Sequence, residues 1–380
     1  MAEKRSIFQD VDAAAAPRVQ PTGGMIDRGR RGARRGIRLW LMLLFALVVV
    51  MIAVGGLTRL TDSGLSITEW RPLTGALPPM NAADWQSEFA LYKASPEFQT
   101  HNNWMSLEDF QVIYWWEWGH RQLGRVIGLV WAVGFLGFLA ARQIPAGWTG
   151  RLLVLGALGG LQGAVGWWMV YSGLGGDRTD VASYRLATHL GLAFVILGFI
   201  AWYVMLLARP ERDLLQAKRT REGRLFGLGT GWLHLTLLQI LIGALVAGID
   251  AGRSYTEWPL MGGNLWPDQM MVFEPWWRNF FENAGTVQFI HRMGGYAVLA
   301  FAVLAVLRGR RSAYTGTRTA FALAFLAVIA QVALGITTVV LGAPWQVAIL
   351  HQFLAVIVWV LILRARFHAG YPVAQSVRGK

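Results

Sequence analysis

The chain has 380 residues, of which 54% are hydrophobic and only 15% are charged, and apolar runs of about twenty residues recur along it, which excludes a water-soluble domain and indicates an integral membrane protein. Its formal net charge of +13 does not indicate a nucleic-acid partner, because the positive residues gather at the ends of the apolar runs and in loops. The absence of cysteine excludes disulfides and thiolate metal sites, so a metal would rest on His, Met or carboxylate.

Eight membrane-spanning helices are predicted from the apolar runs. They are expected at residues 38–60, 118–141, 151–172, 185–207, 225–249, 286–307, 319–341 and 346–364. The corresponding domains are a basic tail at 1–37, a first half at 38–207 with an outer loop at 61–115, a linker at 208–224, a second half at 225–366 with an outer loop at 250–285, and a tail at 367–380.

The distribution of positive charge predicts the orientation. If the N-terminus is inside, the inside segments hold 25 of the 35 Lys and Arg residues, as the positive-inside rule requires. Acidic residues interrupt the basic N-terminal tail, and no short apolar segment with a cleavage site precedes the first span. We therefore expect both termini in the cytoplasm and the protein in the inner membrane of a bacterium, with the mitochondrial inner membrane as the less favoured alternative.

The two halves repeat each other. VGGLTRLTDSGLSITEWRPLTGALPP (54–79) parallels IGALVAGIDAGRSYTEWPLMGGNLWP (242–267). The other parallels are GHRQLGR (119–125) with IHRMGGY (290–296), GGLQGAVGW (159–167) with VIAQVALGI (328–336), and ATHLGLAF (187–194) with ILHQFLAV (349–356). Because an even number of helices separates the copies, they share one orientation. The predicted fold class is an all-α membrane protein of two pseudosymmetric four-helix bundles.

Four of the seven histidines fall at duplicated places, each a few residues into a helix that starts from the outer face. They are His120 and His189 in the first half, and His291 and His351 in the second. Histidines at matching depth on the second and fourth helices of a bundle can ligate a haem iron from both sides, which predicts one haem site per half. A single such histidine could instead hydrogen-bond to a neighbouring helix or reach toward the interface.

Arginines accompany these histidines. Arg121 and Arg292 each follow a histidine directly, and Arg125 lies one turn beyond Arg121. Each could pair with a haem propionate through two parallel hydrogen bonds, or reach a lipid phosphate instead.

Glu117 breaks the repeat, because Gln288 stands at its place in the second half. It precedes His120 by three residues, so both should lie on nearly the same helix face. A carboxyl group at this depth is usually functional, and beside a haem it could exchange protons or stabilise a developing cation. A di-iron carboxylate site is disfavoured because it needs two E-x-x-H motifs and two further carboxylates, whereas the motif occurs once.

The remaining polar residues within the helices are interpreted as packing groups. Gln162 and Gln331 are duplicated in the third and seventh helices and predict interhelical hydrogen bonds in preference to cofactor contacts. His234 has no counterpart, so it is expected to serve helix packing or proton handling rather than ligation.

LTRLTDSGLSITEWRPLTGALPP, WWEWGHRQLGR and the four paired histidines resemble haem A synthases of the CtaA/COX15 family over about residues 38 to 365. The absence of cysteine resembles the alphaproteobacterial and mitochondrial branch, in contrast to a branch with a cysteine pair in its outer loops. The resemblance implies oxidation of the C8 methyl group of haem O to the formyl group of haem A. It also implies a resident haem b as cofactor.

The resemblance also implies a role for each site residue. His291 and His351 would be the axial ligands of haem b, and His120 and His189 would bind the iron of the substrate haem O. Glu117 would be the essential carboxylate. Sequential oxidations through an alcohol and a hydrated aldehyde are then expected beside Glu117, with haem b relaying electrons.

The expected partners are haem O, membrane lipid, an unidentified electron donor, a haem O synthase and cytochrome oxidase assembly factors. A homo-oligomer is one alternative for the oligomeric state. Two other functions stay open on the residues alone. One is a diheme b-type electron carrier or quinol oxidoreductase, in which neither haem is altered, and the other is a haem-delivery protein without catalysis.

Overall fold

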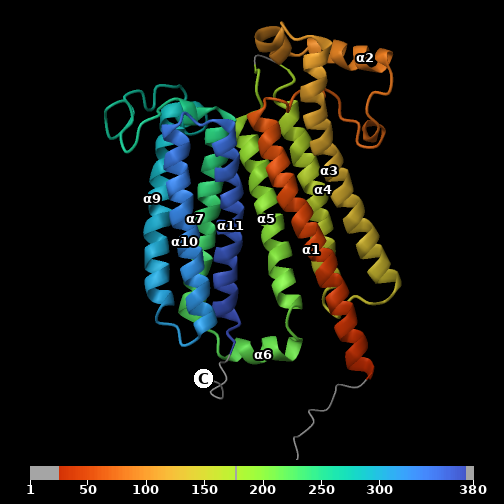
Figure 1. Ribbon diagram of the computed structural model, residues 1–380, viewed down its shortest axis with the longest axis vertical. Helices are drawn as coiled ribbons and strands as arrows, with labels where there is room; N and C mark the ends of the chain where they lie inside the picture. The colour runs from red at the N-terminus through yellow and green to blue at the C-terminus, as the bar shows by residue number, and fades with distance from the viewer. Residues whose placement is uncertain (1–24, 176–177, 374–380) are drawn as a thin grey trace, which may run out of the picture.

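The computed structural model describes residues 25–175 and 178–373, and within them eight helices are long and apolar enough to cross a membrane (Figure 1). They are α1 (Met25–Leu60), α3 (Leu107–Ala140), α4 (Thr149–Tyr171), α5 (Ser183–Leu207), α7 (Gly223–Gly248), α9 (Ala284–Gly309), α10 (Thr315–Val340) and α11 (Trp345–Gly370). Among the described residues there is no strand, only an isolated bridge between Met261 and Asn264. The predicted all-α membrane fold with eight spans is therefore confirmed.

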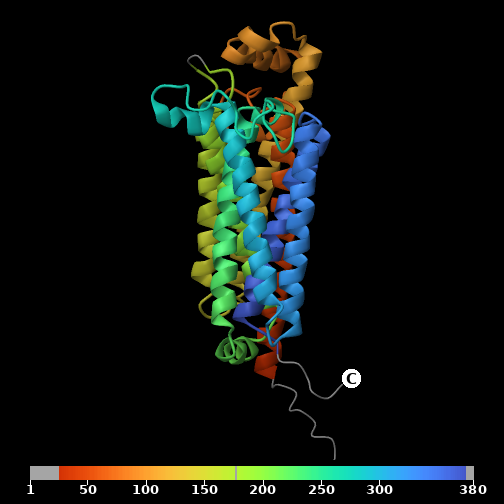
Figure 2. The same cartoon turned by 90° about the vertical axis from the view of Figure 1, so that its left-hand side faces the viewer.

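Two long connections, 61–106 and 249–283, lie at the same end of the helices, which we call the loop end (Figures 1 and 2). They hold the short elements η1 (Thr74–Ala76), α2 (Ala82–Lys93), η2 (Phe98–Asn102), η3 (Ala251–Arg253), η4 (Trp276–Arg278) and α8 (Asn279–Glu282). The opposite end carries α6 (Glu211–Arg219), which lies within the linker predicted at 208–224.

The centre of the molecule is formed by four helices, α1, α5, α7 and α11, which pack against one another. Their buried side chains form one continuous apolar core, in which Phe194 of α5 contacts Trp359 of α11 edge to face. Helices α3 and α4 flank this centre on one side, and α9 and α10 flank it on the other (Figure 1). The chain segments of the two predicted halves therefore meet along a broad apolar interface.

Three helices extend beyond the predicted spans. Helix α1 begins at Met25, before the expected end of the tail at residue 37, and α11 runs to Gly370, past the expected end of the second half at 366. Helix α3 begins at Leu107 instead of 118. In each case the polar residues beyond the apolar run continue the helix, because charge ends the membrane-spanning part of a helix and not the helix itself.

The early start of α3 has a local cause. Ser106 caps the helix, since its hydroxyl accepts from the Asp109 N–H while the Asp109 carboxylate accepts from the Ser106 N–H. The first turns of α3 then bury Phe110 against Phe89 and Tyr92 of the α2 region. The expectation that all four histidines lie a few residues into their helices is therefore wrong for His120, which lies several turns into α3.

Candidate haem sites

Each of the four duplicated histidines lies against a glycine of a neighbouring helix, so closely that a side chain there would collide with the ring. The distances from an added Cβ to the imidazole Cε1 are 2.9 Å for Gly55 and His120, 2.9 Å for Gly166 and His189, 3.0 Å for Gly243 and His291, and 2.9 Å for Gly335 and His351. Gly55 aligns with Gly243 in the sequence repeat, and Gly166 aligns with Gly335. The same helix-to-histidine contact thus occurs at aligned positions of both halves.

In the second half the two histidines face each other from α9 and α11. The ring centroids of His291 and His351 are 6.5 Å apart, and the ring planes are inclined by 81°. Because a bond from a histidine nitrogen to a metal is about 2 Å long, as in zinc sites, this separation leaves room for one metal ion between the rings. Within the described residues no group of three or more His, Cys, Asp or Glu side chains could hold a metal.

Glutamines hold three of the four imidazoles. The Nε2 atoms of Gln162 and Gln331 lie 3.2 Å from Nδ1 of His189 and His351 respectively, and each also donates to the backbone carbonyl of the same histidine at 3.0 Å. The predicted interhelical hydrogen bonds of Gln162 and Gln331 are therefore confirmed. Gln239 of α7 makes the same pair of contacts with His291, at 3.0 and 2.8 Å.

The amide oxygens of these glutamines test whether the site fits a haem. Oε1 of Gln162, Gln239 and Gln331 is buried without a hydrogen-bond partner. A histidine that binds iron through Nε2 carries its proton on Nδ1, so for Oε1 to accept that proton the amide would have to turn and give up its bond to the histidine carbonyl. The second half offers two facing imidazoles, each beside an amide that supplies such an acceptor once turned, and this donor set fits a bis-histidine haem.

In the first half, His120 lies on α3 and His189 on α5. His120 lacks the glutamine partner that the other three histidines have, since its Nδ1 is buried without a hydrogen-bond partner. The residue aligned with Gln239 is Met51.

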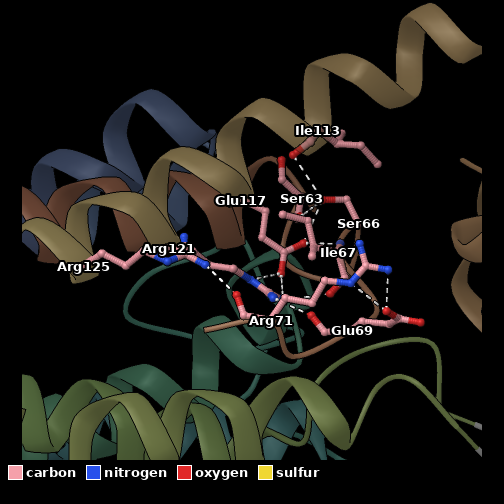
Figure 3. A network of polar contacts seen from close by, with 9 residues as sticks. All are labelled: Ser63, Ser66, Ile67, Glu69, Arg71, Ile113, Glu117, Arg121 and Arg125. Carbon is pink, nitrogen blue, oxygen red and sulfur yellow. Dashed lines mark hydrogen bonds and ion pairs between the residues drawn. The ribbon is translucent and has the colours of Figure 1, made fainter. Parts of the chain in front are cut away.

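Glu117 is buried, with 2% of its surface exposed, and lies against the loop that follows α1 (Figure 3). Its Oε2 accepts from the Ser66 hydroxyl and from the Ile67 N–H, both at 2.7 Å. Its Oε1 accepts from two nitrogens of Arg121, at 3.1 and 2.5 Å. The carboxylate is thereby fixed in one orientation, one helical turn from His120, and no hydrogen bond joins it to that histidine.

The three candidate arginines all bind backbone carbonyls of the loop-end connections. Arg121 donates to the carbonyls of Ile67 and Glu69, besides its ion pair with Glu117. Arg125 donates to the carbonyls of Arg71 and Pro72, and Arg292 donates to those of Tyr255 and Leu260. In this structure these side chains anchor the loops over the helices, and pairing with haem propionates stays a prediction.

His234 lies apart from the four histidines. Its ring is exposed on the surface of α7, and Nδ1 is 2.8 Å from the Thr230 carbonyl of its own helix.

Two kinds of residue were missed at the sequence level. The four glycines beside the histidines recur at aligned positions of the two repeats, a signal that is visible in the sequence. Gln239 gave no such signal, because the repeat places a methionine opposite it.

Comparison with known proteins identifies the family of the chain. Residues 38–363, from α1 to α11, match the COX15-CtaA family, which is described as a cytochrome oxidase assembly protein. The chain belongs to the COX15-CtaA family. The matched COX15-CtaA segment contains all four paired histidines, their glycines and Glu117.

Several members of the COX15-CtaA family that are named Heme A synthase resemble this chain over essentially their whole length. The protein from Ruegeria pomeroyi is 67% identical over 382 residues, and that from Roseobacter denitrificans is 65% identical over 381 residues, each covering 100% of both chains. The protein from Paracoccus denitrificans is 59% identical over 376 residues and covers 99% of both chains.

Proposed function

We propose that this protein is a haem A synthase, an oxidoreductase of the bacterial membrane that converts the C8 methyl group of haem O into the formyl group of haem A for cytochrome oxidase. Membership of the COX15-CtaA family and the names of relatives at 59–67% identity support this function. Counted with water as the oxygen source, the conversion of a methyl into a formyl group releases four electrons and four protons. The protein must therefore hold a haem substrate and provide for proton and electron removal.

The substrate is assigned to the first half and a resident haem b to the second. His120 and His189 would bind the iron of haem O, and His291 and His351 would be the axial ligands of haem b. The observation that carries this assignment is the buried Glu117 carboxylate, because its aligned partner Gln288 cannot ionise. Of the two histidine pairs, only the one in the first half has a carboxylate within one helical turn along the same helix.

Glu117 would act on the substrate through its fixed negative charge and as a proton acceptor. Arg121, Ser66 and Ile67 hold the carboxylate in one orientation before the substrate arrives, so no reorganisation is needed during the reaction. A carboxylate in this state stabilises positive charge that develops at a carbon under oxidation, and it takes up a released proton. When bound, haem b supplies one-electron redox chemistry.

The protein is further proposed to have both termini in the cytoplasm, which puts the loop end outside the inner membrane. The support is the charge distribution along the sequence, since 25 of the 35 Lys and Arg residues belong to the segments predicted to be inside. Haem O would come from a haem O synthase in the same membrane, and the product would pass to cytochrome oxidase assembly factors.

Extraction of the pigments bound to the purified protein, followed by mass spectrometry, tests the function. A haem A synthase yields haem b together with haem O, its hydroxylated derivative and haem A. Haem b alone would indicate an electron carrier instead. A protein that holds haem O but forms no haem A in membranes supplied with haem O would indicate haem delivery without catalysis.

A further inference from the structure

The four histidines are not held alike. The Gln239 amide lies beside Nδ1 of His291, and the Gln162 and Gln331 amides lie near both ring nitrogens of His189 and His351, whereas Nδ1 of His120 is buried without a hydrogen-bond partner. This difference does not follow from the division into halves, because His189 shares the first half with His120. The difference therefore distinguishes His120 from the other three histidines, including its partner His189 in the first half.

Met51 occupies the place in α1 that Gln239 occupies in α7. Each residue lies one turn before the glycine that contacts the histidine, Gly55 and Gly243 respectively. Each side chain reaches the aligned glycine one turn beyond that histidine: the Met51 methyl is 3.5 Å from a Cβ built on Gly124, and Gln239 Nε2 is 3.6 Å from one built on Gly295. The two side chains are unbranched and similar in length, so the difference is one of hydrogen bonding and not of space.

A hydrogen-bond acceptor at Nδ1 affects a histidine ligand in two ways. It fixes the ring orientation and the tautomer that leaves Nε2 free for the metal, and it makes the ring a stronger donor to the metal. The loss of such a partner typically lowers metal affinity by about 10- to 100-fold. The thioether of a methionine is a weak acceptor and cannot replace an amide oxygen.

We infer that Gln239 and Met51 are positioning residues. Gln239 strengthens the bond from His291 to iron, so that the second site retains its haem. Met51 leaves His120 a weak ligand, so that the first site can exchange its haem. The inference rests on the proposed function, in which the first half must release a haem in every turnover while the second half keeps its haem. A strong bond from His189 would orient the substrate, and the weak bond from His120 would let the product leave.

The reciprocal exchange of these two residues tests the inference. The purified full-length protein and its Gln239→Met and Met51→Gln variants are mixed with excess apomyoglobin, which captures released haem, and the haem left on the protein is identified by mass spectrometry over time. We expect Gln239→Met to release haem b about 10- to 100-fold faster. Met51→Gln should release haem O and haem A more slowly by a similar factor and leave haem b unaffected.

Spectroscopic and conservative controls separate positioning from packing. Gln239→Met should raise the midpoint potential of haem b, because a weaker donor stabilises the ferric iron less, whereas a role in helix packing alone would leave the potential unchanged. Gln239→Glu keeps an acceptor and should restore slow release. Equal release of haem O and haem A from Met51→Gln and wild type would overturn the inference, even if Gln239→Met did not fold.

The outcome remains separable from the proposed reaction. If wild-type extracts contained only haem b, haem A synthesis would be refuted. The inference about the ligands would then require two phases of haem b release, of which Met51→Gln slows only the faster one, and a single phase would overturn it.

Discussion

The two halves of the protein share a scaffold and differ at single residues within it. Both place a glycine against each histidine, and both anchor their loop-end connection with the arginine that follows the first histidine. At Glu117 and Gln288, and again at Met51 and Gln239, the halves diverge. The scaffold explains how each half could hold a haem, and the divergent residues explain why the halves would treat their haems differently.

The loop contacts sharpen this comparison. Arg121 donates to the carbonyl of Ile67, and Arg292 donates to that of Tyr255, the residue aligned with Ile67. Gln288 also donates to Tyr255, whereas Glu117 accepts from the Ile67 N–H. The second half thus secures its loop with an amide and an arginine, so loop anchoring does not require a carboxylate. The carboxylate in the first half therefore points to chemistry beyond anchoring.

The largest effect is expected from Glu117→Gln. An amide keeps the size of the side chain but cannot accept a proton or provide a negative charge, so formation of haem A should fall by about 100-fold or more. Haem b should remain bound with an unchanged spectrum, while haem O or its alcohol accumulates in extracted pigments. Gln288→Glu is the matched control and should leave haem A formation nearly unchanged. Normal haem A formation by Glu117→Gln would refute the role of the carboxylate.

A second test concerns the glycines beside the histidines. Gly166→Ala should push His189 out of place, because the new Cβ would lie 2.9 Å from its ring, and bound haem O and haem A should fall about tenfold with haem b retained. Gly335→Ala should instead deplete haem b. Gly163→Ala, in the same helix as Gly166 but with no atom within 4 Å of the new Cβ, should change neither. Equal losses in all three variants would point to general helix destabilisation.

A smaller effect is expected at the contact that joins the halves at the loop end. Arg59 is 13% exposed and bridges two aligned aspartates, Asp62 at 2.6 Å and Asp250 at 2.7 Å. Because both aspartates are partly solvated, Arg59→Leu should lower the free energy of unfolding by only about 1 kcal/mol, measured by thermal unfolding in detergent. Arg212→Leu removes an ion pair whose arginine is 78% exposed and serves as the control, with no change expected.

The smallest effect on haem chemistry is expected from Glu97, in the loop-end connection 61–106. Burial raises the pKa of Glu97 to about 8, and the Tyr92 hydroxyl donates to the carboxylate at 3.2 Å. The folded state therefore binds a proton that the unfolded state releases near its ordinary pKa of 4.5, so stability should fall as the pH rises from 4.5 to about 8. In Glu97→Gln the protease resistance of segment 61–106 should lose this pH dependence, with haem A formation unchanged. An identical pH profile in variant and wild type would contradict the assignment.

Sequence patterns were sufficient for the fold because a bilayer restricts the choices. Twenty-residue apolar runs predicted all eight spans, and the repeat singled out the histidines. What escaped prediction depends on contacts between helices. The contact between Gln239 and His291 depends on how α7 and α9 cross. The contacts of Glu117 with Ser66 and Ile67 depend on the path of an irregular loop, and a loop has no repeating sequence pattern from which its path could be predicted.

The central claim, that the two halves hold different haems, is tested most directly by removing one ligand from each half. Pigments extracted from purified His189→Ala and His351→Ala proteins are identified by mass spectrometry against wild type. The account predicts that His189→Ala loses haem O and haem A and keeps haem b, and that His351→Ala loses haem b. Loss of the same haem from both variants would contradict it.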